Sequence, residues 1–355
     1  MNYVINSRFC TQSMTGVQRY AYELSLRLAK MGGASSASPG NILEHTYTDL
    51  NPTRIGHLEG HAWEQIELPA HLWLTGSPLL VNLANTAPLA YGKQIVTIHD
   101  LAFIRNPHWF SKTFAAYYNF LIPIIARRSM SIITVSEFSK KEIVDLLGIP
   151  PSKIHVIYNG VSEIFKSDVY GNDEKRFGKY ILAVSSFDPR KNLRGLIEAF
   201  LKLKYTDLKL VIAGRASKNF NMDEAFSEPG ANRERIIFLS DISQNELASL
   251  YRGAIALCYP SFYEGFGLPP LEAMASGCPV VASDIESIRE VCRDAAILIN
   301  PNDTGAMTEG LRKLIEDETL RLSLIERGKK RSCLFNWERS ADKIFELIQE
   351  IGRDC

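Results

Sequence analysis

The fold is decided by the stretch Ala254-Ile-Ala-Leu-Cys-Tyr259-Pro260, which is followed closely by Glu264-Gly-Phe-Gly-Leu-Pro-Pro-Leu-Glu272. Its first part is short, apolar and ended by a proline, which predicts a buried parallel strand. Pro269 and Pro270 suit the first turn of a helix, where a missing N–H costs nothing. The stretch therefore predicts a strand, a glycine-containing loop and a helix, which is the repeating unit of an open parallel sheet.

The same alternation of apolar strands and amphipathic helices extends in both directions along the chain. Because strands that alternate with helices form parallel sheets, the sequence predicts an α/β fold of two doubly wound, Rossmann-like domains that face a central cleft. Residues 32–40 and 57–69 are interpreted as surface loops. The expected strands are 3–5, 79–83, 94–98, 131–135, 154–157, 180–184, 209–213, 236–239, 254–259, 279–282 and 296–299, and the main expected helices are 16–31, 111–128, 137–147, 304–315, 320–330 and 338–351.

Length and composition limit the classes of protein that the chain can belong to. At 355 residues it exceeds the usual size of one core, and the polar stretch 166–178 is typical of a linker. We therefore expect an N-terminal domain over 1–165, a C-terminal domain over 166–335 and a final helical segment over 336–355. With 40 basic and 40 acidic residues, the chain has no net charge to attract nucleic acid.

The sequence also favours a cytoplasmic location. The six cysteines form no C-x-x-C pair, and several lie in apolar runs, where cysteine acts as a small hydrophobic residue. The N-terminus lacks the basic start and long apolar stretch of a signal peptide. No run approaches the roughly 18 apolar residues that a membrane-spanning helix needs.

The loop between Glu264 and Glu272 combines the features of a site for a nucleotide sugar. Gly265 and Gly267 allow the backbone to approach a ligand closely, and the helix N-terminus that follows attracts anions. The two carboxylates can accept hydrogen bonds from hydroxyls. The alternative is that Glu264 is a solvated loop residue and Glu272 an exposed helix residue, as most glutamates are.

A second candidate segment, Ser185-Ser-Phe-Asp-Pro-Arg-Lys-Asn192, directly follows the predicted strand 180–184. The charge of a diphosphate must be met by cations or by oriented amides, and Arg190 and Lys191 are placed to supply the cations. The structural alternative is a helix-start turn with two solvated basic residues. His99, with Asp100 beside it, follows another predicted strand, and a lone histidine in such a place is more often structural than functional.

Motifs of other enzyme classes are missing from the sequence. His57 and His61 have no cysteine or acidic partner at the spacing of a metal site. There is no Asp-x-Asp to hold Mg²⁺ against a diphosphate, no P-loop and no G-x-G-x-x-G before the first helix. We therefore expect neither a metal nor a cofactor.

The segment from Glu264 to Glu272 resembles the E-x7-E signature of the retaining GT-B glycosyltransferases, in particular family four, the glycosyl transferases group 1. The resemblance implies that Glu264 contacts the donor sugar, Glu272 contacts the ribose, and the amides of residues 265–268 hold the sugar. It also implies that the C-terminal domain binds the donor, the N-terminal domain binds the acceptor, and the last helix packs back on the N-terminal domain. Many relatives have an arginine five residues before the lysine, where this chain has Ser186, so Arg190 is expected to supply that charge.

Other segments match the family as well. His99 resembles its strand-end histidine, and Gly16-Val-Gln-Arg19 is similar to its glycine-rich entry to the first helix, with Thr15 in place of the preceding glycine. The loop at Gly214 and Arg215 resembles those that approach the nucleotide base. The predicted catalytic residues are His99, Lys191, Arg190 and Glu264, and the predicted donor-binding residues are Gly16, Lys191, Arg190, Gly214, Arg215, Glu264, Gly265, Phe266, Gly267, Leu268 and Glu272.

The resemblance implies a retaining, metal-independent hexosyltransferase of bacterial surface polysaccharide synthesis. The donor expected first is GDP-mannose, a UDP-sugar is second, and the acceptor is a saccharide or a polyprenyl-linked saccharide. The alternatives are a sugar-nucleotide hydrolase or epimerase, and a non-catalytic subunit that binds nucleotide sugars. The aromatic stretch 109–125, which ends near two arginines, is expected to be a buried helix, and its alternative is a helix that contacts the inner face of the membrane.

Overall fold

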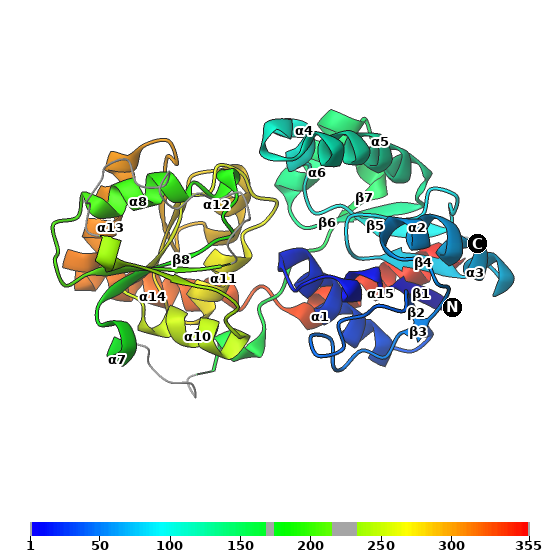
Figure 1. Cartoon of the computed structure of the whole chain (residues 1–355), viewed down its shortest axis with the longest axis horizontal. Helices are drawn as coiled ribbons and strands as arrows, with labels where there is room; N and C mark the ends of the chain where they lie inside the picture. The colour runs from blue at the N-terminus through cyan, green and yellow to red at the C-terminus, as the bar shows by residue number, and fades with distance from the viewer. Residues whose placement is uncertain (1, 168–173, 215–232, 354–355) are drawn as a thin grey trace. The chain divides into compact units, whose positions relative to one another are not determined.

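The structure is a computed structural model that describes residues 2–167, 174–214 and 233–353. The chain divides into two compact units, of which unit 1 comprises residues 1–160 and 336–355 and unit 2 comprises residues 161–335 (Figure 1). Unit 2 therefore begins five residues before the boundary expected at 166. Residues 168–173 of the predicted linker lie outside the described residues.

Unit 1 is built on one parallel sheet with the strand order β3-β2-β1-β4-β5-β6-β7. The strands are β1 (Tyr3–Asn6), β2 (Ala34–Ser38), β3 (Thr53–Arg54), β4 (Leu79–Asn82), β5 (Gln94–Thr97), β6 (Ser131–Thr134) and β7 (Ile154–Val156). The helical elements are η1 (Arg8–Thr11), α1 (Gly16–Lys30), α2 (Gly60–Ala62), η2 (Trp63–Glu67), α3 (Leu68–Leu74), α4 (Ala102–Arg105), η3 (Pro107–Trp109), α5 (Lys112–Arg128), α6 (Glu137–Leu147), η4 (Pro151–Lys153) and α15 (Trp337–Arg353).

Unit 2 is built on a second parallel sheet with the strand order β10-β9-β8-β11-β12-β13. The strands are β8 (Tyr180–Val184), β9 (Lys209–Ala213), β10 (Ile236–Leu239), β11 (Ala256–Tyr259), β12 (Val280–Ser283) and β13 (Ile297–Ile299). The helical elements are η5 (Glu163–Phe165), α7 (Glu174–Phe177), η6 (Pro189–Lys191), α8 (Leu193–Leu201), η7 (Arg233–Arg235), α10 (Gln244–Gly253), α11 (Leu268–Ala275), α12 (Glu286–Cys292), α13 (Thr304–Glu316) and α14 (Glu318–Ser332).

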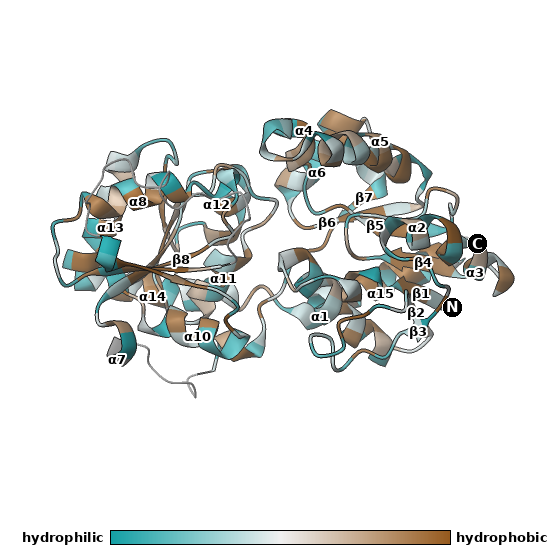
Figure 2. Cartoon of the chain, in the orientation of Figure 1, coloured by the Kyte–Doolittle hydropathy of each residue, from teal (hydrophilic) through white to brown (hydrophobic). Residues whose placement is uncertain are grey.

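Both sheets are doubly wound, because the order of the strands reverses at β1 in unit 1 and at β8 in unit 2. Ligands of open α/β sheets bind outside the carboxyl ends of the strands at such reversal points. The strands of unit 2 are continuous apolar runs, as expected for strands that helices cover on both faces (Figure 2). In unit 2, α8 and α13 pack against each other over one face of the sheet (Figure 1).

One predicted loop is a strand. Residues 32–40 were expected to form a surface loop, but Ala34–Ser38 forms β2, which pairs in parallel with β1. Its sequence, ASSAS, has no large apolar residue, and small polar residues have weak strand propensity. Its neighbours on both sides in the sheet supply the hydrogen bonds that its own residues do not favour, so tertiary pairing decides the structure here.

The expectation of a surface loop at 57–69 is also wrong, because α2, η2 and the start of α3 occupy most of this segment. This segment contains a run of π-helix, in which the side chains do not follow the ordinary helical spacing. Trp63, Leu68 and Leu72 are fully buried in a small core with β1 and β4. The segment is therefore a packed part of unit 1.

The aromatic helix is buried on one face only. In α5 the buried residues include Leu121, Ile122 and Ile125, as the sequence predicts for a core helix. However, Phe114, Tyr117 and Phe120 are exposed by 38%, 36% and 64%. The expectation of a buried helix is therefore wrong for this aromatic face.

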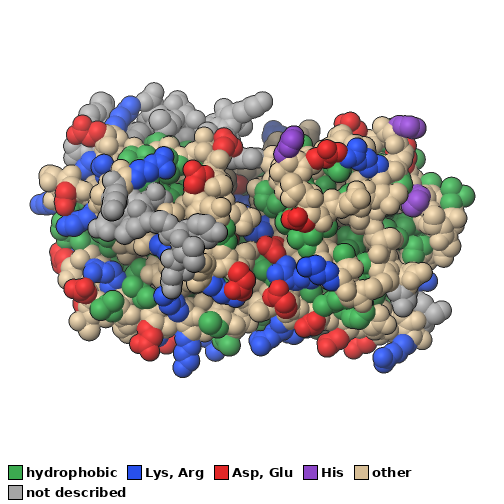
Figure 3. Space-filling model, turned by 90° about the horizontal axis from the view of Figure 1, so that it is seen from below, with side chains coloured by type: hydrophobic (Ala, Val, Ile, Leu, Met, Phe, Trp, Pro, Cys, Tyr) green, Lys and Arg blue, Asp and Glu red, His purple; other side chains and the backbone are tan. Residues whose placement is uncertain are grey.

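On the face drawn in Figure 3, acidic and basic side chains are interspersed. This mixture agrees with the equal numbers of acidic and basic residues in the sequence. Among the described residues, no helix is both long enough and apolar enough to cross a bilayer.

Candidate active site

The loop between β11 and α11 forms as the sequence predicts. β11 is buried along its whole length and ends at Tyr259, directly before Pro260. Gly267 is the N-cap of α11 and has a φ of +119°, which side chains rarely adopt, and Pro269 follows in the first turn. This glycine lets the chain turn sharply from the loop into the helix.

Lys191 and Glu264 meet at the carboxyl ends of neighbouring strands. Lys191 follows β8 and Glu264 follows β11, and these strands are adjacent in the sheet. The Lys191 ammonium donates to Glu264 Oε1 at 2.5 Å and to the Tyr259 hydroxyl at 3.0 Å. The Tyr259 hydroxyl also donates to Glu264 Oε1 at 2.8 Å. The structure thus brings two predicted residues together around a third that was not predicted.

Burial and the neighbouring charges together decide the protonation of this group. Burial alone favours a protonated Glu264, but the charges of Lys191 and Arg190 outweigh it and lower the pKa of this carboxyl. Burial also lowers the pKa of the Lys191 ammonium, although the charge of Glu264 opposes this shift. The pKa of Tyr259 is raised well above its ordinary value by burial and by Glu264, so its hydroxyl stays protonated and donates.

The turn that presents Lys191 is held at both ends. Asp188 caps η6 by accepting from the Arg190 amide at 3.0 Å. Asn192 has a φ of +54°, which asparagine tolerates better than most residues, and its side chain donates to the Pro301 carbonyl at 2.7 Å. The Phe262 amide donates to the Arg190 carbonyl at 2.8 Å, which ties this turn to the loop that contains Glu264.

Arg190 points less directly into the group. Its Nε lies 3.3 Å from Asp188 Oδ2, and the side chain is 23% exposed. The guanidinium is nevertheless close enough for its charge to act on Glu264. Together, Lys191 and Arg190 provide a concentration of positive charge at the carboxyl edge of the sheet, which suits an anionic ligand.

Glu272 has a different environment. It lies in α11, is only 5% exposed and accepts from the Tyr251 hydroxyl at 3.1 Å. Burial, reinforced by the charge of Glu272, raises the pKa of Tyr251 well above its ordinary value. Both predicted carboxylates are therefore buried acceptors, each with a tyrosine partner, and the interpretation of either as a solvated glutamate is wrong.

Two further donor-side candidates, Phe266 and Gly214, lie in unit 2. Phe266 is buried, and its ring packs edge to face on Phe335 at 5.7 Å. Gly214 follows β9, and a Cβ on it would lie 1.8 Å from the Ser185 carbonyl oxygen. Close packing against the loop after β8 is therefore enough to require glycine at position 214. Arg215 lies outside the described residues.

The unit 1 candidates are His99 and Gly16. His99 follows β5 and is only 6% exposed, and its Nε2 lies 3.1 Å from the Leu83 carbonyl. Its ring packs edge to face on Tyr20 at 4.8 Å. Burial lowers the pKa of His99, although the Leu83 carbonyl opposes the shift, so the ring is neutral. Gly16 is exposed and begins α1, as predicted.

Sequence reasoning missed Tyr259 and Tyr251. A usable signal exists for Tyr259, because it is the last residue of an apolar strand and a buried phenol needs a hydrogen-bond partner. Tyr251 lies in α10 and has no such signal. Within the described residues, no three histidine, cysteine or acidic side chains are grouped as a metal site would require.

The comparisons with known proteins agree with this arrangement. Residues 166–331 match the family model of the glycosyl transferases group 1, and residues 61–163 match that of Glycosyltransferase Family 4. The chain belongs to the glycosyl transferases group 1, in the family-four group. This confirms the predicted family.

Among curated relatives, the chain is 32% identical over 238 residues to the O-antigen chain mannosyltransferase RfbU of Salmonella typhimurium. The match covers 66% of this chain and 64% of RfbU, so the chain spans slightly less than two thirds of that relative.

Two solved structures show the fold. Sucrose-phosphate synthase from Thermosynechococcus elongatus superposes with a TM-score of 0.80 at 18% identity and covers 100% of both chains. Anabaena HepE in complex with UDP-glucose has a TM-score of 0.79 at 16% identity, covering 99% of this chain and 100% of that one. These likenesses confirm the predicted GT-B architecture of two Rossmann-like α/β domains.

Proposed function

We propose that the protein is a retaining, metal-independent hexosyltransferase that takes mannose from GDP-mannose, or alternatively a hexose from a UDP-sugar. The acceptor is a saccharide or a polyprenyl-linked saccharide of bacterial surface polysaccharide synthesis. Family membership supports the nucleotide-sugar donor, and the name of RfbU supports mannose and the O-antigen context. The complex of HepE with UDP-glucose supports a UDP-sugar as the second choice.

The observation that most supports the proposal is the buried group of Lys191, Tyr259 and Glu264. Lys191 and Arg190 stabilise the charge that develops on the diphosphate as the bond to the sugar breaks. Glu264 accepts from hydroxyls of the donor sugar, and Glu272 accepts from the ribose. Lys191 can exchange its contact with Glu264 for a contact with a phosphate, because the two cations and the carboxylate lie within one small region.

The chemical step follows from the family. The new glycosidic bond forms on the face that the diphosphate leaves, and a phosphate oxygen accepts the proton of the acceptor hydroxyl. His99 is a neutral hydrogen-bonding group in this scheme, and its two ring nitrogens allow it to contact a sugar hydroxyl. Gly16 and the loop at Gly214 and Arg215 are further donor contacts in the proposal.

The experiment measures sugar transfer and donor binding in Lys191→Ala and Glu264→Ala. Removing one group that stabilises transition-state charge costs about 10²- to 10³-fold in turnover, so we expect losses of that size in folded variants. Lys179→Ala is the matched control, because Lys179 pairs with Asp207 at 3.4 Å on the surface of the same unit. Unchanged turnover in either folded site variant would rule out the assignment.

The same assays separate the alternatives. Release of free sugar without an acceptor would indicate a hydrolase or epimerase, and saturable binding without any product would indicate a non-catalytic subunit. A thermal-shift screen of sugar nucleotides identifies the donor, because a ligand at about 100 times its Kd adds about 2.7 kcal/mol to the free energy of unfolding.

A peripheral contact with the inner face of the cell membrane is part of the proposal. It is supported by the exposed aromatic residues Phe114 and Phe120 of α5 and by the exposed arginines at the end of that helix. Sedimentation with vesicles that contain anionic lipids tests it, and a Phe120→Ser variant that sediments as well as the wild type would contradict it.

A further inference from the structure

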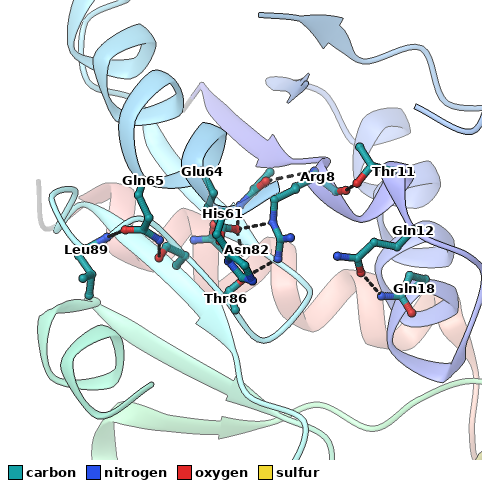
Figure 4. A network of polar contacts seen from close by, with 12 residues as sticks. Arg8, Thr11, Gln12, Gln18, His61, Glu64, Gln65, Asn82, Thr86 and Leu89 are labelled. Carbon is teal, nitrogen blue, oxygen red and sulfur yellow. Dashed lines mark hydrogen bonds and ion pairs between the residues drawn. The ribbon is translucent and has the colours of Figure 1, made fainter. Parts of the chain in front are cut away.

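A second group of buried polar residues lies in unit 1, at the carboxyl ends of β1 and β4. Asn6 and Asn82 end these two strands and are paired in register. Arg8 follows in η1, Thr86 follows β4, and Glu64 reaches the group from η2 (Figure 4). We call Asn6, Arg8, Glu64, Asn82 and Thr86 the Glu64 cluster.

The hydrogen bonds of the Glu64 cluster converge on one oxygen. Glu64 Oε1 accepts from Asn6 Nδ2 at 2.9 Å, from Arg8 Nε at 3.1 Å and from Thr86 Oγ1 at 3.1 Å. Arg8 Nη2 donates to Thr86 Oγ1 at 2.7 Å. Burial alone would raise the pKa of Glu64, but the charge of Arg8, with the hydrogen bonds of His61 and Asn6, outweighs it and lowers this pKa, so the carboxylate is ionised.

The second oxygen of Glu64, Oε2, is buried, and its polar neighbour is the ring nitrogen Nδ1 of His61, 3.4 Å away. His61 acts on Glu64 through a side-chain hydrogen bond and through its charge, and both help to lower the pKa of the carboxyl. Among the described residues no shorter hydrogen bond reaches Oε2. An unsatisfied buried acceptor costs about 1–3 kcal/mol, and more when it is charged. A hydroxyl or water that donates to Oε2 would give this oxygen a closer hydrogen bond than His61 does.

The cluster lines a hollow that fits a group of that size. Asn6, Arg8, Glu64 and Thr86 supply its polar wall, and Leu83 is part of the apolar side. The cavity has a volume of about 10 Å³, which is room for about one water molecule and hence for one hydroxyl. The carbonyl of Leu83 also contacts His99, so the hollow adjoins a predicted catalytic residue.

Aromatic rings lie next to the cluster. The His61 ring packs on Tyr117 at 4.9 Å, and Tyr118 stacks on Phe114 at 4.2 Å. Tyr117 and Phe114 are both more than one third exposed. Sugars present hydroxyls at their edges and C–H groups on their faces, so a polar cluster beside exposed aromatic rings is suited to a carbohydrate.

We propose that the Glu64 cluster, with His61 and Tyr117, is a subsite that binds a hydroxyl of the saccharide acceptor. Glu64 Oε2 accepts the hydrogen bond of the hydroxyl, Arg8 and Thr86 hold the carboxylate in place, and Tyr117 packs on the sugar ring. The assignment to the acceptor rests on the proposed function, because unit 2 contains the donor-side residues. These residues are binding and positioning residues, and no bond is made or broken on them.

The experiment measures binding of octyl glycosides of glucose, galactose, mannose and N-acetylglucosamine by saturation-transfer NMR. We expect saturation of sugar-ring protons with the wild-type protein and at least tenfold weaker binding with Glu64→Gln. Tyr117→Ala, at a partly exposed position, is a second variant that tests the site if Glu64→Gln does not fold. Saturation confined to the octyl chain, or equal ring-proton binding to both folded variants and the wild type, would overturn the proposal.

Two controls test whether weaker glycoside binding comes from the subsite itself. Glu142 is another buried glutamate of unit 1, paired with Arg105 at 2.6 Å, and Glu142→Gln should lower stability without weakening glycoside binding. Binding of GDP-mannose and UDP-glucose to the wild type and to Glu142→Gln is measured in parallel and should be the same in both. If the wild type binds the glycosides but neither nucleotide sugar, the proposed function fails while the saccharide subsite stands.

Discussion

Burial acts on Lys191, Glu264 and His99 in the same direction, since it favours the neutral form of each side chain. For Glu264 burial is the largest single effect on the pKa, but the charges of Lys191 and Arg190 and the hydrogen bond from Lys191 together outweigh it, and the carboxylate stays ionised. His99 has only a carbonyl and the more weakly acting Asp100 to oppose burial, so its pKa falls. The candidate residues therefore include a charged pair in unit 2 and, described separately, a neutral imidazole in unit 1.

The lowered pKa of His99 predicts a pH dependence of stability. The unfolded chain binds a proton at His99 near the ordinary pKa of about 6.5, whereas the folded protein does so only at lower pH. Between these values the unfolded state binds more protons, so stability falls as the pH falls, by up to about 1.4 kcal/mol per pH unit. In His99→Gln, whose side chain can still donate to Leu83, denaturant titrations should show a shallower loss below pH 6.5.

The comparison variant for this prediction is His108→Gln, at an exposed position in the same unit. It should follow the wild-type profile of unfolding free energy against pH. A His99→Gln profile parallel to that of the wild type over the whole acidic range would show that His99 is not the buried neutral group described above.

At the scale of elements, the strands that could be predicted are those whose own residues favour a strand. The runs at β8 and β11 are apolar and bounded by turn residues, so their pattern and their burial agree. β2 could not be predicted, because its small polar residues form a strand only when β1 and β3 are beside them. The helices over residues 60–74 were missed since a π-helical run disrupts their periodicity.

The same limit applies to the site. Lys191 and Glu264 could be predicted because each follows a recognisable strand, and parallel strands end at one edge of a sheet. Glu64 could not, since it lies in a segment interpreted as a loop and meets Arg8 from 56 positions away in the chain. Contacts between distant segments depend on the packing of whole elements, which local sequence patterns do not record.

Gly267 begins α11 at the candidate site, so replacing it should change both the stability of the protein and donor binding. Gly267→Ala should lower stability by roughly 1–2 kcal/mol, because an L-residue is strained at a positive φ. The added Cβ would also lie 2.6 Å from Ile288 Cδ1, so α11 should shift and donor binding should weaken. Chemical denaturation and titration with sugar nucleotides measure the two effects.

Gly148→Ala is the matched control, because Gly148 has a φ of +66° with open space around it. It should show a similar cost in stability and no change in donor binding. Unaltered donor binding in Gly267→Ala would mean that the start of α11 does not support the donor site.

At the scale of the whole molecule, the chain leaves unit 1 at Gly160 and returns to it at Asn336. The returning helix α15 packs beside α1 (Figure 1). The Ser340 hydroxyl donates to the Tyr158 carbonyl at 2.7 Å, and Trp337 packs on Tyr20 with ring centroids 5.9 Å apart. Unit 1 is therefore complete only after the last helix has been made.

Because α15 belongs to unit 1, a change in α15 should destabilise residues 1–160, which lie more than 175 positions away in the sequence, more than its sequence neighbours in unit 2. Trp337 is 1% exposed, and Trp337→Ala should cost about 3–5 kcal/mol, as large truncations in a core do. Hydrogen exchange should then show loss of protection across 1–160, including Tyr20, with less change across 161–335. Phe200→Ala, in the core of unit 2, should give the opposite distribution. Equal loss in both units with Trp337→Ala would show that α15 stabilises the chain as a whole, because only a helix that belongs to one unit can weaken that unit selectively.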